Sequence, residues 1–396
     1  MTPGDQTSER TAALAGVRVI DLAPVGPAAR ATRLLADYGA DVVKVGPVPR
    51  HATVAVVPPP YAYSGYRGMR RALFDLKSDE GRDAFLALTR DADVVVESFR
   101  PGVADRLGVG YEAVRALNER VVYCSTSGYG QTGPRRHWAG HDLNYLAVSG
   151  YVHCSGRDAD GTPALPGATV ADIAAGGMHA ALAMLAALLR RDRTGRGEYL
   201  DVSVADGAIG MMSLYADEHL ATGAEPGPGH YILTGRYACY GVYACADGRH
   251  LSVAAIEHAF WANLCRELGL ERYIDAQTDD AAQDEIRAAI TAVLASADRD
   301  EWVRRLGPAD CCVAPVNSVS EAVADEQYRA RGVVVKAEHP TEGTIEQIAP
   351  VWAGAEPAGS PCDLPDLTLT HTAELLAEAG YDESRIAEMA AAGVIA

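Results

Sequence analysis

The feature that most constrains this chain is an alternation of short β-rich segments with helical segments through its first half. Apolar, mostly Val-rich segments occur at residues 17–22, 41–45, 72–76, 94–97 and 121–125, with amphipathic stretches between most of them. Because parallel strands must be joined by crossover connections, this order predicts an α/β fold with a doubly wound, mostly parallel sheet. Sheets of this kind bind ligands at the carboxyl ends of their strands.

Three segments follow predicted strands and are candidates for that ligand site. They are Gly26-Pro27, residues 98–102 and residues 127–131. A GxGxxG dinucleotide fingerprint is absent after the first strand, so Gly26 fits a tight strand-to-helix turn equally well. A long, buried, Ala-rich helix is expected from Asp172 to Arg190, with apolar residues on nearly every face. A Gly/Pro-rich segment at residues 223–229 marks the best domain boundary.

Charge and cysteine content limit the functions that the chain can have. The net charge of -18 argues against a nucleic-acid partner. The eight cysteines include no CxxC pair, so we expect reduced thiols in a cytoplasmic protein without a metal site. The N-terminus is polar, and no run reaches the length of a membrane span, so no signal peptide and no membrane partner are expected.

A local excess of cations interrupts this acidic composition between residues 67 and 106. Such a cluster suits an anionic ligand such as a phosphate, but a run of charges more often marks a solvated surface. From composition alone, both interpretations stay open. The cations are Arg67, Arg70, Arg71, Lys77, Arg100 and Arg106.

A series of ordered motifs resembles the family III CoA-transferase (CaiB/BaiF) superfamily. They occur at residues 16–22, 34–45, 75–78, 97–103, 128–134 and 193–197. Two further motifs resemble its α-methylacyl-CoA racemase-like branch. These are Gly140-His141-Asp142-Leu143-Asn144-Tyr145 and Ala255-Ile256-Glu257.

The resemblance implies a fold and an assembly. It implies a Rossmann-like large domain formed by both chain ends, a smaller α+β domain and an interlocked homodimer. With the Gly/Pro-rich boundary, we expect a large CoA-binding domain at residues 1–222 and a small domain at 223–332. Residues 333–396 would then return to the large domain.

The resemblance also implies an active site. His141 and Asp172 would serve opposite faces of the α-carbon, and Glu257 would hydrogen-bond the imidazole. An acyl-CoA thioester is the implied substrate, so coenzyme A is part of the substrate and no cofactor is required. The residues implied in CoA binding are Lys77, Arg100, Arg106, Gly130 and Tyr145.

Inverting a carbon beside a thioester carbonyl requires one group to remove a proton and another to return it. His and a tuned carboxyl group suit this exchange. Because Asp172 opens a predicted helix, we expect backbone N–H groups there, including its own, to stabilise the enolate oxygen. Without the resemblance, however, Asp172 would be an ordinary helix cap and His141 a core residue.

Two alternatives remain at this stage. In family III CoA-transferases, an Asp at the position of Asp172 attacks the thioester as a nucleophile. A catalytically silent CoA-binding homologue is the other alternative. The chain also departs from the racemase pattern, with Ala168 in place of an Asn and with Arg236 and Cys239 before a hairpin that is predicted at residues 240–255. These departures leave the acyl group open.

Overall fold

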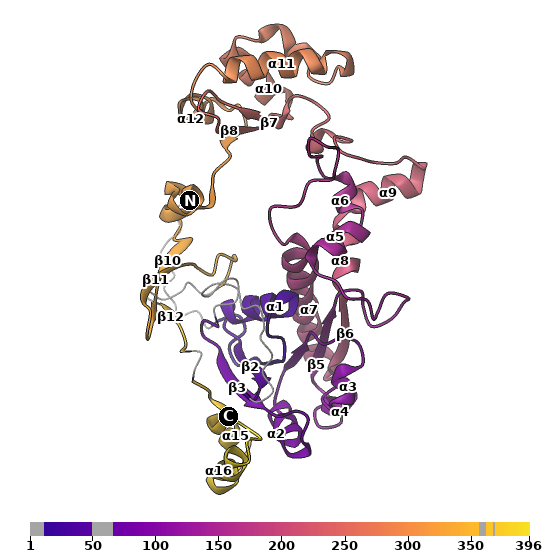
Figure 1. Ribbon diagram of the computed structural model, residues 1–396, viewed down its shortest axis with the longest axis vertical. Coiled ribbons are helices and arrows are strands. Elements are labelled where there is room, and N and C mark those ends of the chain that lie inside the picture. The colour runs from indigo at the N-terminus through magenta and orange to yellow at the C-terminus, as the bar shows by residue number, and fades with distance from the viewer. Residues whose placement is uncertain (1–11, 50–65, 356–361, 367–368) are drawn as a thin grey trace. The chain divides into compact units, whose positions relative to one another are not determined.

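The computed structural model describes residues 12–49, 66–355, 362–366 and 369–396 (Figure 1). Contacts divide the chain into two compact units. Unit 1 comprises Met1–Tyr151, Pro166–Leu214 and Ala330–Ala396, and unit 2 comprises Val152–Leu165 and Tyr215–Arg329. The sequence-based division assigns residues 152–165 and 215–222 to the large domain, whereas in the structure they belong to unit 2.

Unit 1 contains a six-stranded sheet with the order β3-β2-β1-β4-β5-β6. Every neighbouring pair in it is parallel, which confirms the predicted doubly wound sheet. The order reverses between β1 and β4, and ligands bind at such a switch point in related architectures. Its strands are β1 (Arg18–Asp21), β2 (Asp41–Pro47), β3 (Arg70–Phe74), β4 (Val94–Glu97), β5 (Val122–Ser127) and β6 (Glu198–Ser203).

Helices cover the sheet or follow its strands. The chain between the first two strands predicts a helix at residues 28–38 that ends at Gly39. In the structure, α1 (Gly26–Asp37) begins earlier, with Pro27 in its first turn, and Gly39 (φ +92°) follows its end as predicted. Ser78 caps α2 by accepting the Gly81 N–H at 3.1 Å. Among the described residues, the helices that lie wholly in unit 1 before residue 214 are α1 (Gly26–Asp37), α2 (Asp79–Thr89), α3 (Val103–Arg106), α4 (Tyr111–Arg115), α5 (Asp142–Val148), the π-helical η2 (Ala171–Met178), α7 (His179–Thr194) and α8 (Val204–Met211).

Alternating side chains of the strands bury both faces of the sheet. On β1, Val19 packs with α1 and α7, whereas Ile20 faces the cluster that contains α2 and the C-terminal helices. Because successive side chains point to opposite faces, a strand covered on both sides is apolar throughout. This explains why β4 reads as a run of valines.

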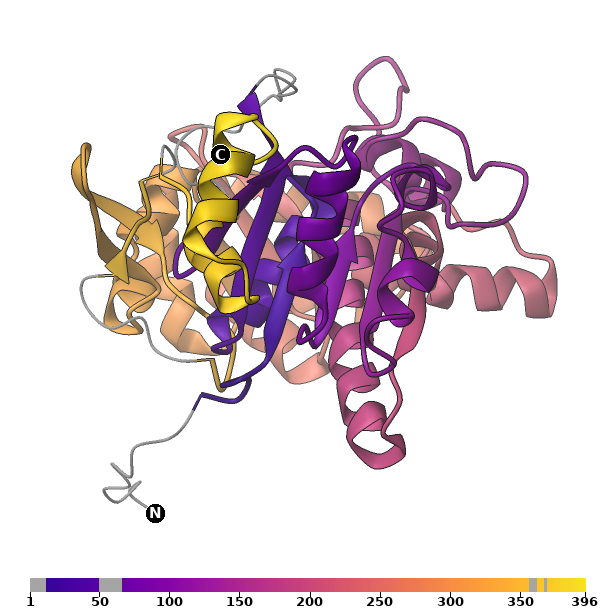
Figure 2. The same ribbon diagram turned by 90° about the horizontal axis from the view of Figure 1, so that it is seen from below.

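The C-terminal segment returns to the sheet of unit 1. Figure 2 shows α15 (Thr372–Glu378) and α16 (Glu383–Ala391), in yellow, in front of its strands. The chain end extends this contact, because the Asp75 N–H donates to the Val394 carbonyl at 2.8 Å. The sequence predicts a final helix near residues 371–380 and misses α16. It also misses a small sheet of β10 (Val334–His339), β11 (Gly343–Ile348) and β12 (Cys362–Asp363).

The helical segment Ala171–Thr194 differs from its prediction in two respects. One face is open, since Leu182 and Leu189 are 68% and 63% exposed. Among the described residues, this segment alone is long and apolar enough to span a membrane by length and composition, with a mean hydropathy of 1.6. The expectations that this helix is buried, and that no run approaches the length of a membrane span, are therefore wrong.

Unit 2 has its own core around a three-stranded antiparallel sheet of β7 (Tyr240–Ala244), β8 (His250–Ala254) and β9 (Val313–Pro315). Trp261, Ile286 and Trp302 are buried against it. The main helices are α10 (His258–Leu268), α11 (Gln283–Leu294) and α12 (Arg299–Leu306), and α13 (Val319–Ala324) follows. Three short helices cross the unit boundaries: α6 (Tyr151–Cys154), α9 (Ser213–Thr222) and α14 (Glu326–Ala330).

A close contact between α8 and η2 gives the first testable prediction. A Cβ at Gly207 would lie 2.1 Å from the Ala175 carbonyl oxygen, which forces the backbones apart. We expect Gly207→Ala to lower the free energy of unfolding by about 1–3 kcal/mol, measured by denaturant titration. Gly210→Ala, on the same helix with no atom within 4 Å, is the matched control and should be neutral or stabilising. Equal effects of the two changes would contradict this account.

Candidate active site

Asp172 lies in the first turn of η2, half-buried, as the sequence predicts for the start of a helix. Its backbone N–H donates to Oδ1 of Asp142 at 2.8 Å. The prediction that this N–H stabilises an enolate oxygen is therefore wrong for the structure as it stands, because a carboxylate already accepts it. The second carboxylate comes from α5, thirty positions earlier in the chain.

Small residues hold η2 against its neighbours. A Cβ at Gly176 would lie 2.6 Å from Pro27 Cβ, and one at Gly177 would lie 3.0 Å from Arg30 Cβ. Both glycines thus allow α1 to approach η2 closely. A π-helical turn in a long helix often occurs at a functional site. Here it places Asp172 beside α1 and α5.

The environment of Asp172 raises the pKa of its carboxyl group. Burial is the largest cause, and the negative charge of Asp142 adds to it. Electrostatic interaction with Arg30, and then with the His141 imidazole, opposes the rise. A carboxyl group whose pKa is raised in this way can exchange a proton nearer to neutral pH than an exposed aspartate can.

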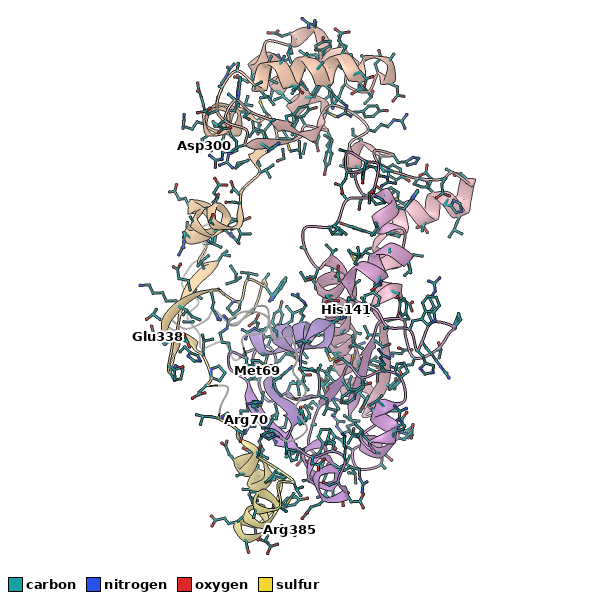
Figure 3. The ribbon with its side chains drawn as sticks, in the orientation of Figure 1. Met69, Arg70, His141, Asp300, Glu338 and Arg385 are labelled. Atoms are coloured by element: carbon teal, nitrogen blue, oxygen red, sulfur yellow. The ribbon has the colours of Figure 1, made fainter. Side chains whose placement is uncertain are left out.

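His141 immediately precedes α5, and its side chain is exposed (Figure 3). Its backbone is extended, and its N–H donates to Oδ1 of Asn144 at 2.9 Å. This bond fixes the entry of the chain into α5. The structure therefore brings His141 and Asp172 into electrostatic reach of each other within unit 1.

Tyr145 packs behind this pair rather than at the surface. It is 7% exposed, and its hydroxyl donates to the Gly140 carbonyl at 2.6 Å. Cβ atoms at Gly128 and Gly140 would both lie within 3 Å of its ring, so both positions must lack a side chain. Burial, with Asp172 next, raises the pKa of Tyr145 to about 12, so it remains a neutral phenol. Its role as a CoA contact stays a prediction.

An exposed aromatic loop adjoins Tyr145, and sequence reasoning missed it. Trp138 is 59% exposed, with the Arg135 guanidinium 5.2 Å above its ring. Tyr129 lies edge-on to both Trp138 and Tyr145, at centroid distances of 6.3 and 5.3 Å. An Arg-Arg-His-Trp run beside a candidate catalytic His is the signal that could have identified this loop.

The six cations of the basic cluster differ in their surroundings. Arg67 pairs with Asp37 at 3.2 Å, and Arg70 pairs with Asp41 and Glu378 at 2.7 and 2.8 Å. Lys77, Arg100 and Arg106 are exposed, and within the described residues none of these three forms an ion pair. These three are the cations that the resemblance implies for CoA binding. The structure thus leaves their charges available to an anion.

Gly130 lies in the loop after β5. Its φ of +80° favours glycine there. The next residue, Gln131, donates its N–H to Asp201 of β6 at 3.1 and 3.0 Å. The loop is thereby fixed at the carboxyl edge of the sheet, and the part of Gly130 in CoA binding stays a prediction.

Glu257 belongs to unit 2, where it precedes α10 with an exposed side chain. The Gln277 side chain holds the preceding segment through the carbonyls of Ala255 and Ile256 at 3.0 and 2.8 Å. Its pairing with His141 stays a prediction. Among the described residues, no cluster of His, Cys, Asp or Glu could hold a metal ion.

Fold and site together define an α/β protein with a histidine, a half-buried carboxyl group and available cations near the carboxyl edge of a parallel sheet. Comparison with known proteins identifies the family within this class. The model of CoA-transferase family III matches residues 14–367, and the chain belongs to this family.

Named relatives include both racemases and transferases. The chain is 32% identical to the mouse (Mus musculus) alpha-methylacyl-CoA racemase over 383 residues, covering 95% of this chain and 96% of that one. It is also 32% identical to the acetyl-CoA:oxalate CoA-transferase of Acetobacter aceti, covering 81% and 85%. Among solved structures, a CaiB/BaiF family protein from Brucella suis matches with a TM-score of 0.77 and 28% identity, covering 93% and 100%.

The carboxylate pair gives a prediction that is independent of the substrate. Asp142→Asn removes the negative charge beside Asp172, so the pKa of Asp172 should fall toward its usual value. Carboxyl-carbon NMR titration of the aspartates measures this shift. Asp192→Asn, at the exposed far end of α7, is the control that should leave the Asp172 titration unchanged. An unchanged Asp172 pKa in Asp142→Asn would contradict the assignment.

Proposed function

We propose that this protein epimerises the α-carbon of a 2-methyl-branched or otherwise α-substituted acyl-CoA thioester by 1,1-proton transfer through an enolate. The observation that carries the proposal is the proximity of His141 to a carboxyl group, Asp172, whose pKa is raised. A histidine and a carboxyl group with a raised pKa can each serve as acid or base. Similarity to alpha-methylacyl-CoA racemases over nearly the whole chain supports it.

In this mechanism, one group removes the α-proton and leaves an enolate, and the other delivers a proton to the opposite face. The roles of His141 and Asp172 exchange with the direction of reaction. Glu257 of unit 2 would accept a hydrogen bond from the His141 imidazole, which fixes its tautomer and raises its basicity. Arg30 adds positive charge beside Asp172, where negative charge develops on the substrate.

Coenzyme A is part of the substrate, so the proposal needs no separate cofactor and no metal. Lys77, Arg100 and Arg106 would bind its phosphates through charge-assisted hydrogen bonds. Gly130 would let the thioester end approach the backbone, and Tyr145 would form a wall behind the acyl group. The protein would act in the cytoplasm, without a nucleic-acid or membrane partner.

The exposed apolar side chains of unit 1 support an interlocked homodimer. Leu182, Leu189 and Ile209 are each more than half exposed on α7 and α8. Large apolar side chains that are exposed to solvent are typical of an interface. A second copy of this chain would cover them, and a monomer in sedimentation at micromolar concentration would contradict this.

A CoA-transferase is the alternative that a specific observation favours, because relatives named as CoA-transferases are as similar as the racemases. In that reaction the Asp172 carboxylate would attack the thioester carbonyl, and CoA would leave as its thiolate. A silent CoA-binding homologue is the remaining alternative. His141 is the residue that favours the racemase over both.

The test uses one epimer of 2-methylbutyryl-CoA in deuterated water, with oxalate and succinate added as free acids. We expect deuterium at the α-carbon and formation of the other epimer, because each turnover delivers a solvent proton. The products are separated by chiral chromatography and mass spectrometry. Oxalyl-CoA or succinyl-CoA without α-deuteration would support the transferase instead. Binding of the thioester without either product would support the silent homologue.

A further inference from the structure

A pocket of unit 1 opens at the carboxyl ends of β4 and β5, and the proposed proton transfer does not use it. Its lining includes Glu97, Arg100, Asp105, Tyr111, Ser125 and Tyr199. Glu97 is the last residue of β4 and only 3% exposed. A buried carboxyl group in a pocket beside a proposed binding loop is a candidate for a functional role.

The contacts of Glu97 tie three segments together. Its Oε2 accepts the Phe99 N–H at 2.6 Å, and its carboxyl group also hydrogen-bonds the Ser125 side chain of β5. The chain then turns at Gly102, whose φ is +80°, into α3. Glu97 therefore holds the root of the loop that presents Arg100 and Arg106.

Arg106 remains close to this loop. A Cβ at Gly102 would lie 3.4 Å from its guanidinium. Arg100 itself lines the pocket together with Glu97. A negative charge on Glu97 thus lies in the same pocket as Arg100, at the start of the loop that carries both cations that we propose for the CoA phosphates.

The surroundings of Glu97 disfavour its charged form. Within the described residues Glu97 has no ion pair, and the carboxylates that face it are Asp105 on α3 and Asp201 on β6. The other titratable side chains that line the pocket are Glu112 and Tyr111 on α4 and Tyr123 and Tyr199 on the strands. Among the described residues of this lining, Arg100 is the one cation. Burial first, and then Asp105 and Asp201, raise the pKa of Glu97 to about 7, against the hydrogen bonds from Ser125 and Phe99.

We propose that Glu97 is a positioning residue whose protonation is coupled to binding of the CoA phosphates at Arg100 and Arg106. This inference rests on the proposed CoA site. A neutral Glu97 leaves the positive potential of the loop undiminished, whereas an ionised Glu97 opposes a polyanion. The bound polyanion in turn favours the protonated carboxyl group, so binding takes up a proton.

The direction of the pH dependence of CoA affinity follows from the linkage between proton binding and CoA binding. Below neutral pH Glu97 is already protonated, so its carboxyl group does not weaken the binding of CoA. As the pH rises through the pKa of about 7, the free protein loses this proton and the affinity for CoA falls. Because CoA titrates too, the informative quantity is the ratio of dissociation constants for two variants with the same ligand.

The test measures the dissociation constant of CoA for the full chain and for Glu97→Gln by calorimetry from about pH 6 to about pH 8.5. Gln is neutral and its oxygen can still accept the Phe99 N–H. The informative ratio is the dissociation constant of the unchanged chain divided by that of Glu97→Gln. We expect it to be near one at the acid end of the range and to rise about threefold to tenfold at the basic end, since a shift of one pKa unit on binding changes the affinity tenfold. A ratio that does not change with pH would overturn the inference.

Two further variants separate the possible outcomes. Glu112→Gln removes an exposed carboxylate of the same pocket and should leave the pH dependence as it is. Ser125→Ala removes a hydrogen bond that lowers the pKa of Glu97, so the fall in affinity should move to higher pH; this variant decides the matter if Glu97→Gln does not fold. Absence of CoA binding in every folded variant would overturn the proposed CoA site, and this inference with it.

Discussion

The close approach of η2 to α1 and α8 is the constraint on which the site depends. It exists because Gly176, Gly177 and Gly207 carry no Cβ where another element passes. Through it, Asp172 is half-buried between elements distant in the sequence and its N–H reaches Asp142. The same approach brings Arg30 into reach. The pKa of Asp172 is therefore a property of backbone packing as much as of its neighbouring charges.

Charge is arranged locally against an acidic background. Arg67 and Arg70 are neutralised by carboxylates of unit 1, so they act as structural cations. Lys77, Arg100 and Arg106 have no such partners in the described part of the chain. Composition could not separate the two groups, because an ion pair forms between residues far apart in sequence. An overall net charge of -18 is therefore compatible with a local cluster of cations, unpaired among the described residues, that suits a polyanion.

Much of the fold could be predicted because its determinants are local. The strands β2 and β4 are set by their own runs of valine, and the structure confirms both. The site was less predictable. The bond from Asp172 to Asp142 and the π-helical turn depend on packing across the fold, which no local pattern encodes.

The family resemblance supplied what local patterns could not. It placed His141 and Asp172 in one site, and the structure brings them into electrostatic reach. It could not show that the Asp172 N–H is already bonded, nor that Trp138 extends the aromatic cluster. The first feature depends on the packing of η2 against α5, and the second on the loop that precedes α5.

The most direct test of the central claim compares His141→Ala with Asp172→Asn, using each pure epimer of 2-methylbutyryl-CoA in deuterated water. If the two groups serve opposite faces, each variant should lose initial α-deuteration from a different epimer, by about 10²-fold to 10⁴-fold. His250→Ala, an exposed histidine of β8, should exchange both epimers normally. Loss of exchange from the same epimer in both variants, or full exchange from both epimers in either one, would contradict the account.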